Sequence, residues 1–236
     1  MAIGTPVAIG TANTTSGNAV LTTTGAAPAN SVVFFIVGWS FSSAVTLTGV
    51  TGGSLTWTID YQQPFSGVAE WGYALVSAQA PAGLGSSAVL TGTYSGVVTA
   101  SMIAGAYCTG LATSGVADVH DGQGQGAATN WDTTATSTTF SDTLVLGGSI
   151  HDGLATNTPT GGASALSDFQ NATEAWSMCV EYKILASIQS TSLTGTWSSG
   201  ANNVTNAFVA YKGVPAGIVD TTTRRYQIRR SRGTSW

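Results

Sequence analysis

Apolar and polar residues alternate cleanly along the nine residues of segment 176–184. The apolar positions are Trp176, Met178, Val180, Tyr182 and Ile184. The positions between them are Ser177, Cys179, Glu181 and Lys183. A period of two places the two sets on opposite faces of a β-strand. The pattern therefore predicts a half-buried strand whose Glu181 and Lys183 face is exposed.

Other segments of the chain show the same kind of pattern. Trp71, Tyr73 and Leu75 alternate with small residues, and the continuously apolar run Val32–Val37 predicts a central core strand. Segments rich in Gly, Asn, Ser and Thr separate these strands, as the turns of an antiparallel sheet require. No segment shows a convincing helical period, so we expect an all-β protein.

Three blocks of sequence occur twice in the same order. Leu90–Tyr94 (LTGTY) returns as Leu193–Trp197 (LTGTW). The other two pairs are Glu70–Leu75 with Ala175–Val180, and Ala106–Leu111 with Ala210–Val214. The offsets of the three pairs are 103, 105 and 104 residues. A nearly constant offset predicts two diverged copies of one unit.

The repeats divide the chain into a first β unit, 1–113, a second β unit packed with it, 114–217, and a basic C-terminal arm, 218–236. Each unit offers four or five strands. A single sheet of that size has one uncovered apolar face, so the units must pack face to face or interleave. The predicted fold is an antiparallel, jelly-roll-like β-sandwich of two pseudo-repeated units, with the arm extended outside it.

Charge is scarce and unevenly distributed. Charged residues make up only 8% of the chain, against a usual quarter. Residues 1–223 hold two lysines and all 11 acidic residues, a net charge of −9, and residues 224–236 hold five arginines. The acidic body should repel nucleic acid and anionic membranes. We also expect no secretion signal, because the first residues show no basic region followed by an apolar one. We expect no membrane span, because no apolar run approaches the required length.

The order of these features resembles that of β-sandwich modules in structural proteins of tailed bacteriophages, of the capsid-decorating, minor tail or fibre type. In the first unit the features are Val32–Trp39, Thr46–Gly53, Leu55–Ile59, Glu70–Val76, Val89–Tyr94 and Ala100–Gly110. The second unit departs from the pattern, because no tryptophan corresponds clearly to Trp57. The resemblance implies a virion location, capsid or tail proteins as partners, and a homo-oligomer, commonly a trimer. It carries no catalytic residue.

Two His-Asp-Gly motifs are the most site-like residues of the body. They are His120-Asp121-Gly122 and His151-Asp152-Gly153. They could bind a metal ion if their loops met. We favour the alternative that each Asp-Gly closes a turn, because the motifs do not occupy equivalent repeat positions. Cys108 and Cys179 form no metal motif and are either bridged or, as we favour, buried thiols. We expect no metal and no cofactor.

Candidate catalytic groups are few. Glycoside hydrolysis needs two nearby carboxyl groups, and the candidates are Asp60, Glu70, Glu174 and Glu181. The segment Gly38–Ser42 approaches a Gly-x-Ser-x-Gly nucleophile elbow but lacks its last glycine and a following helix. We could assemble no triad, so we expect that the protein is not an enzyme.

Aromatic residues suggest a carbohydrate-binding alternative, since they supply stacking area and a polar edge. Most tryptophans fall in predicted strands and should be core residues. Trp131 lies in a polar Thr- and Asn-rich segment, so we predict it as an exposed residue of a possible ligand loop.

The C-terminal arm is the predicted partner-binding element. Its candidate residues are Arg224, Arg225, Tyr226, Arg229, Arg230, Arg232 and Trp236. They could stack on and neutralise nucleic acid, dock on an acidic protein surface, or merely solvate the chain. The acidic body disfavours nucleic acid, and Ile228 and Trp236 disfavour a purely solvating role. The expected function is therefore that of a virion accessory protein that decorates or cements the capsid. The alternative is a minor tail or fibre protein with a carbohydrate- or receptor-binding role.

Overall fold

The computed structural model describes residues 2–214, apart from 42–44, 65–70, 127 and 201–202. Within these ranges the chain forms antiparallel β-strands and no helix, which confirms the predicted all-β class. No helix that could cross a membrane is found in the described part of the chain. The predicted arm, 218–236, lies outside the described residues.

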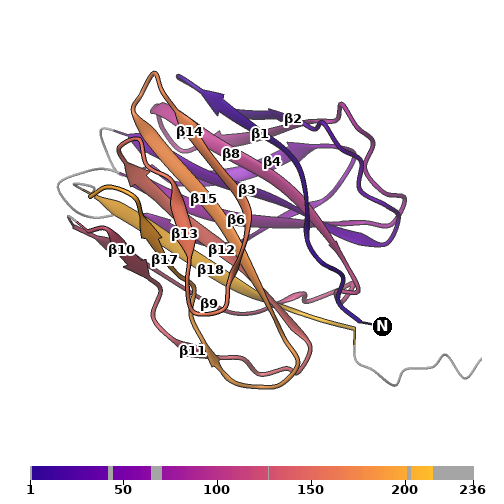
Figure 1. Cartoon of the computed structure of the whole chain (residues 1–236). Coiled ribbons are helices and arrows are strands. Elements are labelled where there is room, and N and C mark those ends of the chain that lie inside the picture. The colour runs from indigo at the N-terminus through magenta and orange to yellow at the C-terminus, as the bar shows by residue number, and fades with distance from the viewer. Residues whose placement is uncertain (1, 42–44, 65–70, 127, 201–202, 215–236) are drawn as a thin grey trace, which may run out of the picture.

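The first half contributes a five-stranded and a three-stranded sheet (Figure 1). The larger sheet has the order β1 (Val7–Thr14), β8 (Val98–Thr109), β3 (Ser31–Phe41), β6 (Trp71–Ala80), β5 (Trp57–Pro64). The smaller sheet has the order β2 (Ala19–Thr22), β7 (Val89–Tyr94), β4 (Leu47–Gly52).

The second half also contributes a five-stranded and a three-stranded sheet. The larger sheet has the order β14 (Ser164–Asn171), β15 (Trp176–Leu185), β12 (Thr143–Asp152), β18 (Val204–Lys212), β9 (Ala117–Gln125). The smaller sheet has the order β10 (Asn130–Asp132), β17 (Thr194–Trp197), β13 (Asn157–Pro159). A short extra pair joins β11 (Thr136–Ser137) and β16 (Ser190–Thr191).

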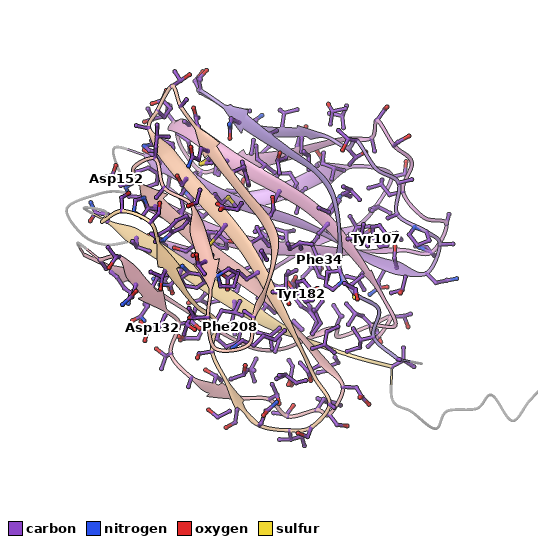
Figure 2. The ribbon with its side chains drawn as sticks, viewed as in Figure 1. Phe34, Tyr107, Asp132, Asp152, Tyr182 and Phe208 are labelled. Carbon is purple, nitrogen blue, oxygen red and sulfur yellow. The ribbon has the colours of Figure 1, made fainter. Side chains whose placement is uncertain are left out.

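Three hydrophobic cores lie between these sheets. One fills the space between the two sheets of the first half, and a second does the same in the second half. The third joins the two five-stranded sheets, so that Phe34 and Ile36 of β3 share a core with Leu146 and Val180 of the other half. Figure 2 shows Phe34 and Tyr182, one from each half, in the middle of the molecule. The two main sheets of each half together hold eight strands, more than the four or five strands expected per unit.

Strand β15 shows why the four layers form. Val180 faces the core shared by the halves, whereas Cys179 faces the core of the second half. Both faces of this strand are therefore covered. The prediction of an exposed Glu181 face is wrong, because a second sheet covers it and Glu181 is 0% exposed.

Strands of the two larger sheets contact each other across the middle of the molecule. Strand β1 contacts β14, β5 contacts β9, and β6 contacts β18. The rings of Trp71 and Trp176 meet edge to face with their centroids 4.2 Å apart. The Tyr73 hydroxyl donates a hydrogen bond to the Cys179 carbonyl across the same contact, at 3.3 Å. Cys108 and Cys179 are both buried free thiols, as predicted.

Candidate functional site

A pocket of about 570 Å³ lies at the seam between the two halves. Strands β5 and β6 contribute Thr58, Asp60, Ser77 and Gln79 to its lining. The connection between β8 and β9 contributes residues 113–116, and β9 contributes Ala117. Hydroxyl, amide and carboxyl groups thus converge on one cavity, which is the arrangement expected of a small-ligand or side-chain site.

Asp60 is the acidic group of this pocket. It lies at the break in register between Ile59 and Tyr61 where β5 pairs with β6. Its carboxylate accepts a hydrogen bond from the Tyr211 hydroxyl, at 3.0 Å, and another from the Ser77 hydroxyl. Burial raises the pKa of Asp60 to about 6, and the two hydrogen bonds oppose that rise. The carboxylate therefore has neutral donors rather than a cation as its identified partners.

The wall of the pocket is tied to the end of β18. Ala112 N donates to the Lys212 carbonyl, and Lys212 N donates to the Val116 carbonyl, each at 2.8 Å. Val214 N donates to the Gly110 carbonyl at 2.9 Å. The last described residues consequently run beside the wall of the pocket. Figure 1 shows the N-terminus close to the same end of β18.

A second polar cluster lies between the two sheets of the second half. Glu181 accepts a hydrogen bond from the Asn157 side chain, and Asn157 N donates to Asp168 at 3.0 Å. The other Glu181 oxygen, Oε2, has no hydrogen-bond partner among the described residues. Burial raises the pKa of Glu181 to about 7, although Asn157 and Lys183 act in the opposite direction. This carboxyl group has the pKa of a proton donor or acceptor near neutral pH.

The three candidate carboxylates that the structure describes do not form a catalytic pair. Asp60 contacts Tyr211 on the face of sheet β14-β15-β12-β18-β9 that packs on the first half. Glu181 lies on the opposite face of that sheet, beside Cys179 of the other core. Glu174 N donates to the Asn171 side chain in the turn before β15, and Glu70 lies outside the described residues. The segment that approaches a nucleophile elbow forms no strand-to-helix turn at Gly38 and Ser40, because both residues lie in strand β3 and pair with β6 and β8.

The two histidines occupy different environments. The His120 ring stacks on Tyr61, with the centroids 4.4 Å apart. His151 is buried, and its two ring nitrogens lie 3.1 Å from the carbonyl oxygens of Gly153 and Ser199. Within the described ranges, no group of three or more His, Cys, Asp or Glu residues could hold a metal ion.

Trp131 is not an exposed residue of a ligand loop, and that prediction is corrected. It lies in β10 with 1% of its surface exposed, and its ring nitrogen donates to Asn157 at 2.9 Å. The alternation of β10 turns Trp131 inward, against Gly195 of β17. The polar neighbours within the strand, Asn130 and Asp132, occupy its outer face. The carbohydrate-binding alternative thereby loses its candidate residue.

The predicted partner-binding residues Arg224, Arg225, Tyr226, Arg229, Arg230, Arg232 and Trp236 lie outside the described residues. Sequence reasoning considered Asp60 only as a glycosidase acid and missed Ser77, Gln79 and Tyr211 as its neighbours. No family model, no curated protein and no solved structure matches this chain.

Proposed function

We propose that the protein is an accessory structural protein of a bacteriophage virion, which decorates or cements the capsid through its basic C-terminal segment. The separation of charge is the observation that carries this proposal. Residues 2–214 hold ten acidic residues and two lysines, whereas all five arginines follow residue 223. An arginine-rich segment on an acidic body suits a partner with exposed carboxylates, because arginine pairs with carboxylates in bidentate fashion.

The architecture supports a mechanical role. Four layers of sheet with three cores give a body whose strands are held by long-range contacts, as a protein that strengthens a shell requires. The resemblance of the sequence to phage β-sandwich modules points the same way. The partner is a major capsid or tail protein, and self-association of the body accompanies binding.

We further propose that the two halves are copies of one jelly-roll-like unit. The two larger sheets support this proposal, since β1-β8-β3-β6-β5 and β9-β18-β12-β15-β14 place successive strands of each half in the same order. The smaller sheets, β2-β7-β4 and β10-β17-β13, correspond in the same way. The reciprocal contacts of β1 with β14 and of β5 with β9 are those expected of an internal twofold relation.

Sedimentation with virions tests the proposed function. Full-length protein is mixed with particles from the cells that produce it, alongside a version that ends at Thr223 and a full-length version with all five arginines changed to serine. We expect only the full-length arginine-bearing protein to sediment with the particles, with binding that weakens as salt rises. Failure of the full-length protein to sediment, or equal sedimentation of all three, would overturn the proposal.

A further inference from the structure

The seam pocket presents hydrogen-bond acceptors and a carboxylate. Gln79 Nε2 donates to the Ala112 carbonyl at 2.9 Å, and its side-chain oxygen accepts no hydrogen bond from the described residues. Thr58 adds a hydroxyl group to the lining of the same pocket. A ligand that donates several hydrogen bonds and carries positive charge therefore matches the lining best.

Within the described structure, neither lysine side chain pairs with the Asp60 carboxylate. Residues 1–182 contain neither lysine nor arginine. Lys212 follows Tyr211, but its ammonium group lies 4.5 Å from the centre of the Phe140 ring, whereas Tyr211 contacts Asp60. Lys183 of β15 donates to the Ser192 carbonyl at 2.6 Å. Asp60 is thus left with the hydroxyl groups of Ser77 and Tyr211 as its described partners.

Strand β14 of the second half has a bulge like the one at Asp60 in β5, and it packs without a carboxylate. Strand β14 has its register break between Ala165 and Ser167, as β5 has between Ile59 and Tyr61. The residue at that break is Leu166, which packs on the shared core, whereas the first half has Asp60. An apolar side chain satisfies the bulge, so the bulge alone does not require Asp60, whose carboxylate also accepts the hydrogen bond of the buried Tyr211 hydroxyl.

The position of the pocket identifies the source of a cation. Val116 belongs to the pocket wall, and its carbonyl accepts a hydrogen bond from Lys212 N. Lys212 is two residues before Val214, the last described residue. The next arginine is Arg224, ten residues further along. Ten residues span at most about 33–36 Å when fully extended, which is more than enough to return to the wall of the adjacent pocket. The five arginines of segment 224–232 are the only arginines in the chain.

We propose that the seam pocket is a receptor for a guanidinium group, and that an arginine of the chain's own segment 224–232 occupies it in the free protein. Asp60 accepts a charge-assisted pair of hydrogen bonds from the guanidinium, and the Gln79 side-chain oxygen accepts a further one. The segment is then held on its own body until a partner with more carboxylates displaces it. This goes beyond an anchoring role, because it adds an internal competitor for the partner.

Arginine side-chain NMR tests the proposal on the full chain. Protein labelled with ¹⁵N-arginine gives Nε–Hε resonances from the segment alone. We expect at least one resonance to be shifted and protected from solvent exchange, and to lose both properties in Asp60→Asn, which retains an acceptor for Tyr211. Asp142→Asn is the matched control, since Asp142 lies near the same end of β18 without lining the pocket. Substitution of each arginine by lysine then identifies the occupant.

Three results would overturn the proposal. They are five unprotected resonances in the unmodified protein, a protected resonance that persists in Asp60→Asn, and protection that disappears on dilution, which would indicate a second copy. The far-ultraviolet and near-ultraviolet circular dichroism of each variant confirms that the body is folded. Because no virion is needed, failure here is distinguishable from failure of the sedimentation experiment.

Discussion

Glu181 occupies a position in the second half where an apolar residue would be expected. At the offset of 105 residues seen for this strand, Val76 of the first half corresponds to Glu181, and Val76 is fully buried among apolar side chains. Glu181 is equally buried but has one oxygen without a hydrogen-bond partner in the described structure. A buried carboxyl group in this state favours its protonated form.

Stability should therefore depend on pH near neutrality. The pKa of Glu181 rises from 4.5 to about 7 on folding. Between these values the folded protein keeps a proton that the unfolded chain releases, so the contribution to stability is full below about pH 4.5 and is lost as pH rises through 7. The loss is on the order of 3 kcal/mol. Urea unfolding from pH 4 to 8 measures it, and Glu181→Gln should remove this dependence.

Asp60→Asn is the control for the pH experiment. In the version that ends at Thr223, where no arginine can pair with Asp60, burial raises the pKa of Asp60 from 3.8 to about 6, so its contribution is lost over a lower range. In that version, Asp60→Asn should make the decline between about pH 4 and 6 shallower and leave the decline between about pH 6 and 7 to Glu181. If Glu181→Gln and the unmodified protein declined equally in that upper range, Glu181 would not be the group responsible.

Gly195 makes room for the inward Trp131. A Cβ atom at Gly195 would lie 2.5 Å from both the Trp131 ring nitrogen and Asn157 Oδ1. We expect Gly195→Ala to lower the free energy of unfolding by about 1–3 kcal/mol, as overpacking of a core typically does. Gly85→Ala has open space around it and should change stability by less than about 0.5 kcal/mol. Equal effects in urea unfolding would argue against a close Trp131 contact.

At the scale of the strand, local alternation predicted which segments form strands but not what covers them. The pattern in 176–184 identified β15, yet its polar face is buried because a separate three-stranded sheet packs on it. That sheet is built from β10, β13 and β17, of three or four residues each, which are too short to give a periodic pattern. Periodicity alone cannot detect such strands, so the number of layers was underestimated.

The third repeated block is out of register by one residue in the strands. Strands β12 and β18 of the second half take the places that β3 and β8 take in the first. Tyr211 of β18 lies opposite Leu144 of β12, as Cys108 of β8 lies opposite Val32 of β3. Tyr211 therefore takes the place of Cys108 and not that of Tyr107. Tyr211 accordingly faces the shared core and reaches Asp60, whereas Tyr107 packs in the first half. A shift of one residue moves a side chain to the other face of a sheet. The seam pocket could not be assembled from the sequence for this reason.

The Trp71 and Trp176 pair tests the contact between the larger sheets. The edge-to-face geometry predicts a coupling free energy of about 0.5–1.5 kcal/mol in a double-mutant cycle of Trp71→Leu and Trp176→Leu. Trp197 belongs to the separate core of the second half, so a cycle of Trp71→Leu with Trp197→Leu should be additive within about 0.5 kcal/mol. Two additive cycles would contradict a direct contact between the halves.

At the scale of the whole molecule, the halves depend on each other. One face of each larger sheet is buried only because the other half packs on it. The side chains buried in this way include Phe34, Met102, Met178 and Val209. Exposure of such a face leaves apolar side chains in water at about 25 cal/mol per Å². We expect the intact chain to unfold in one transition, and residues 1–113 alone to bind a hydrophobic dye and unfold without cooperativity. A cooperative, dye-free 1–113 fragment would show that the halves are independent.

Protein mass spectrometry of purified particles tests the proposed virion role most directly. Particles released from the producing cells are banded by density in high salt and in low salt, and the chain is quantified against the major shell protein. The account predicts that the chain bands with low-salt particles in a fixed ratio to the shell protein and declines in high salt, because arginine contacts hold it. A chain that is abundant in the lysate but missing from particles under both conditions would contradict the account.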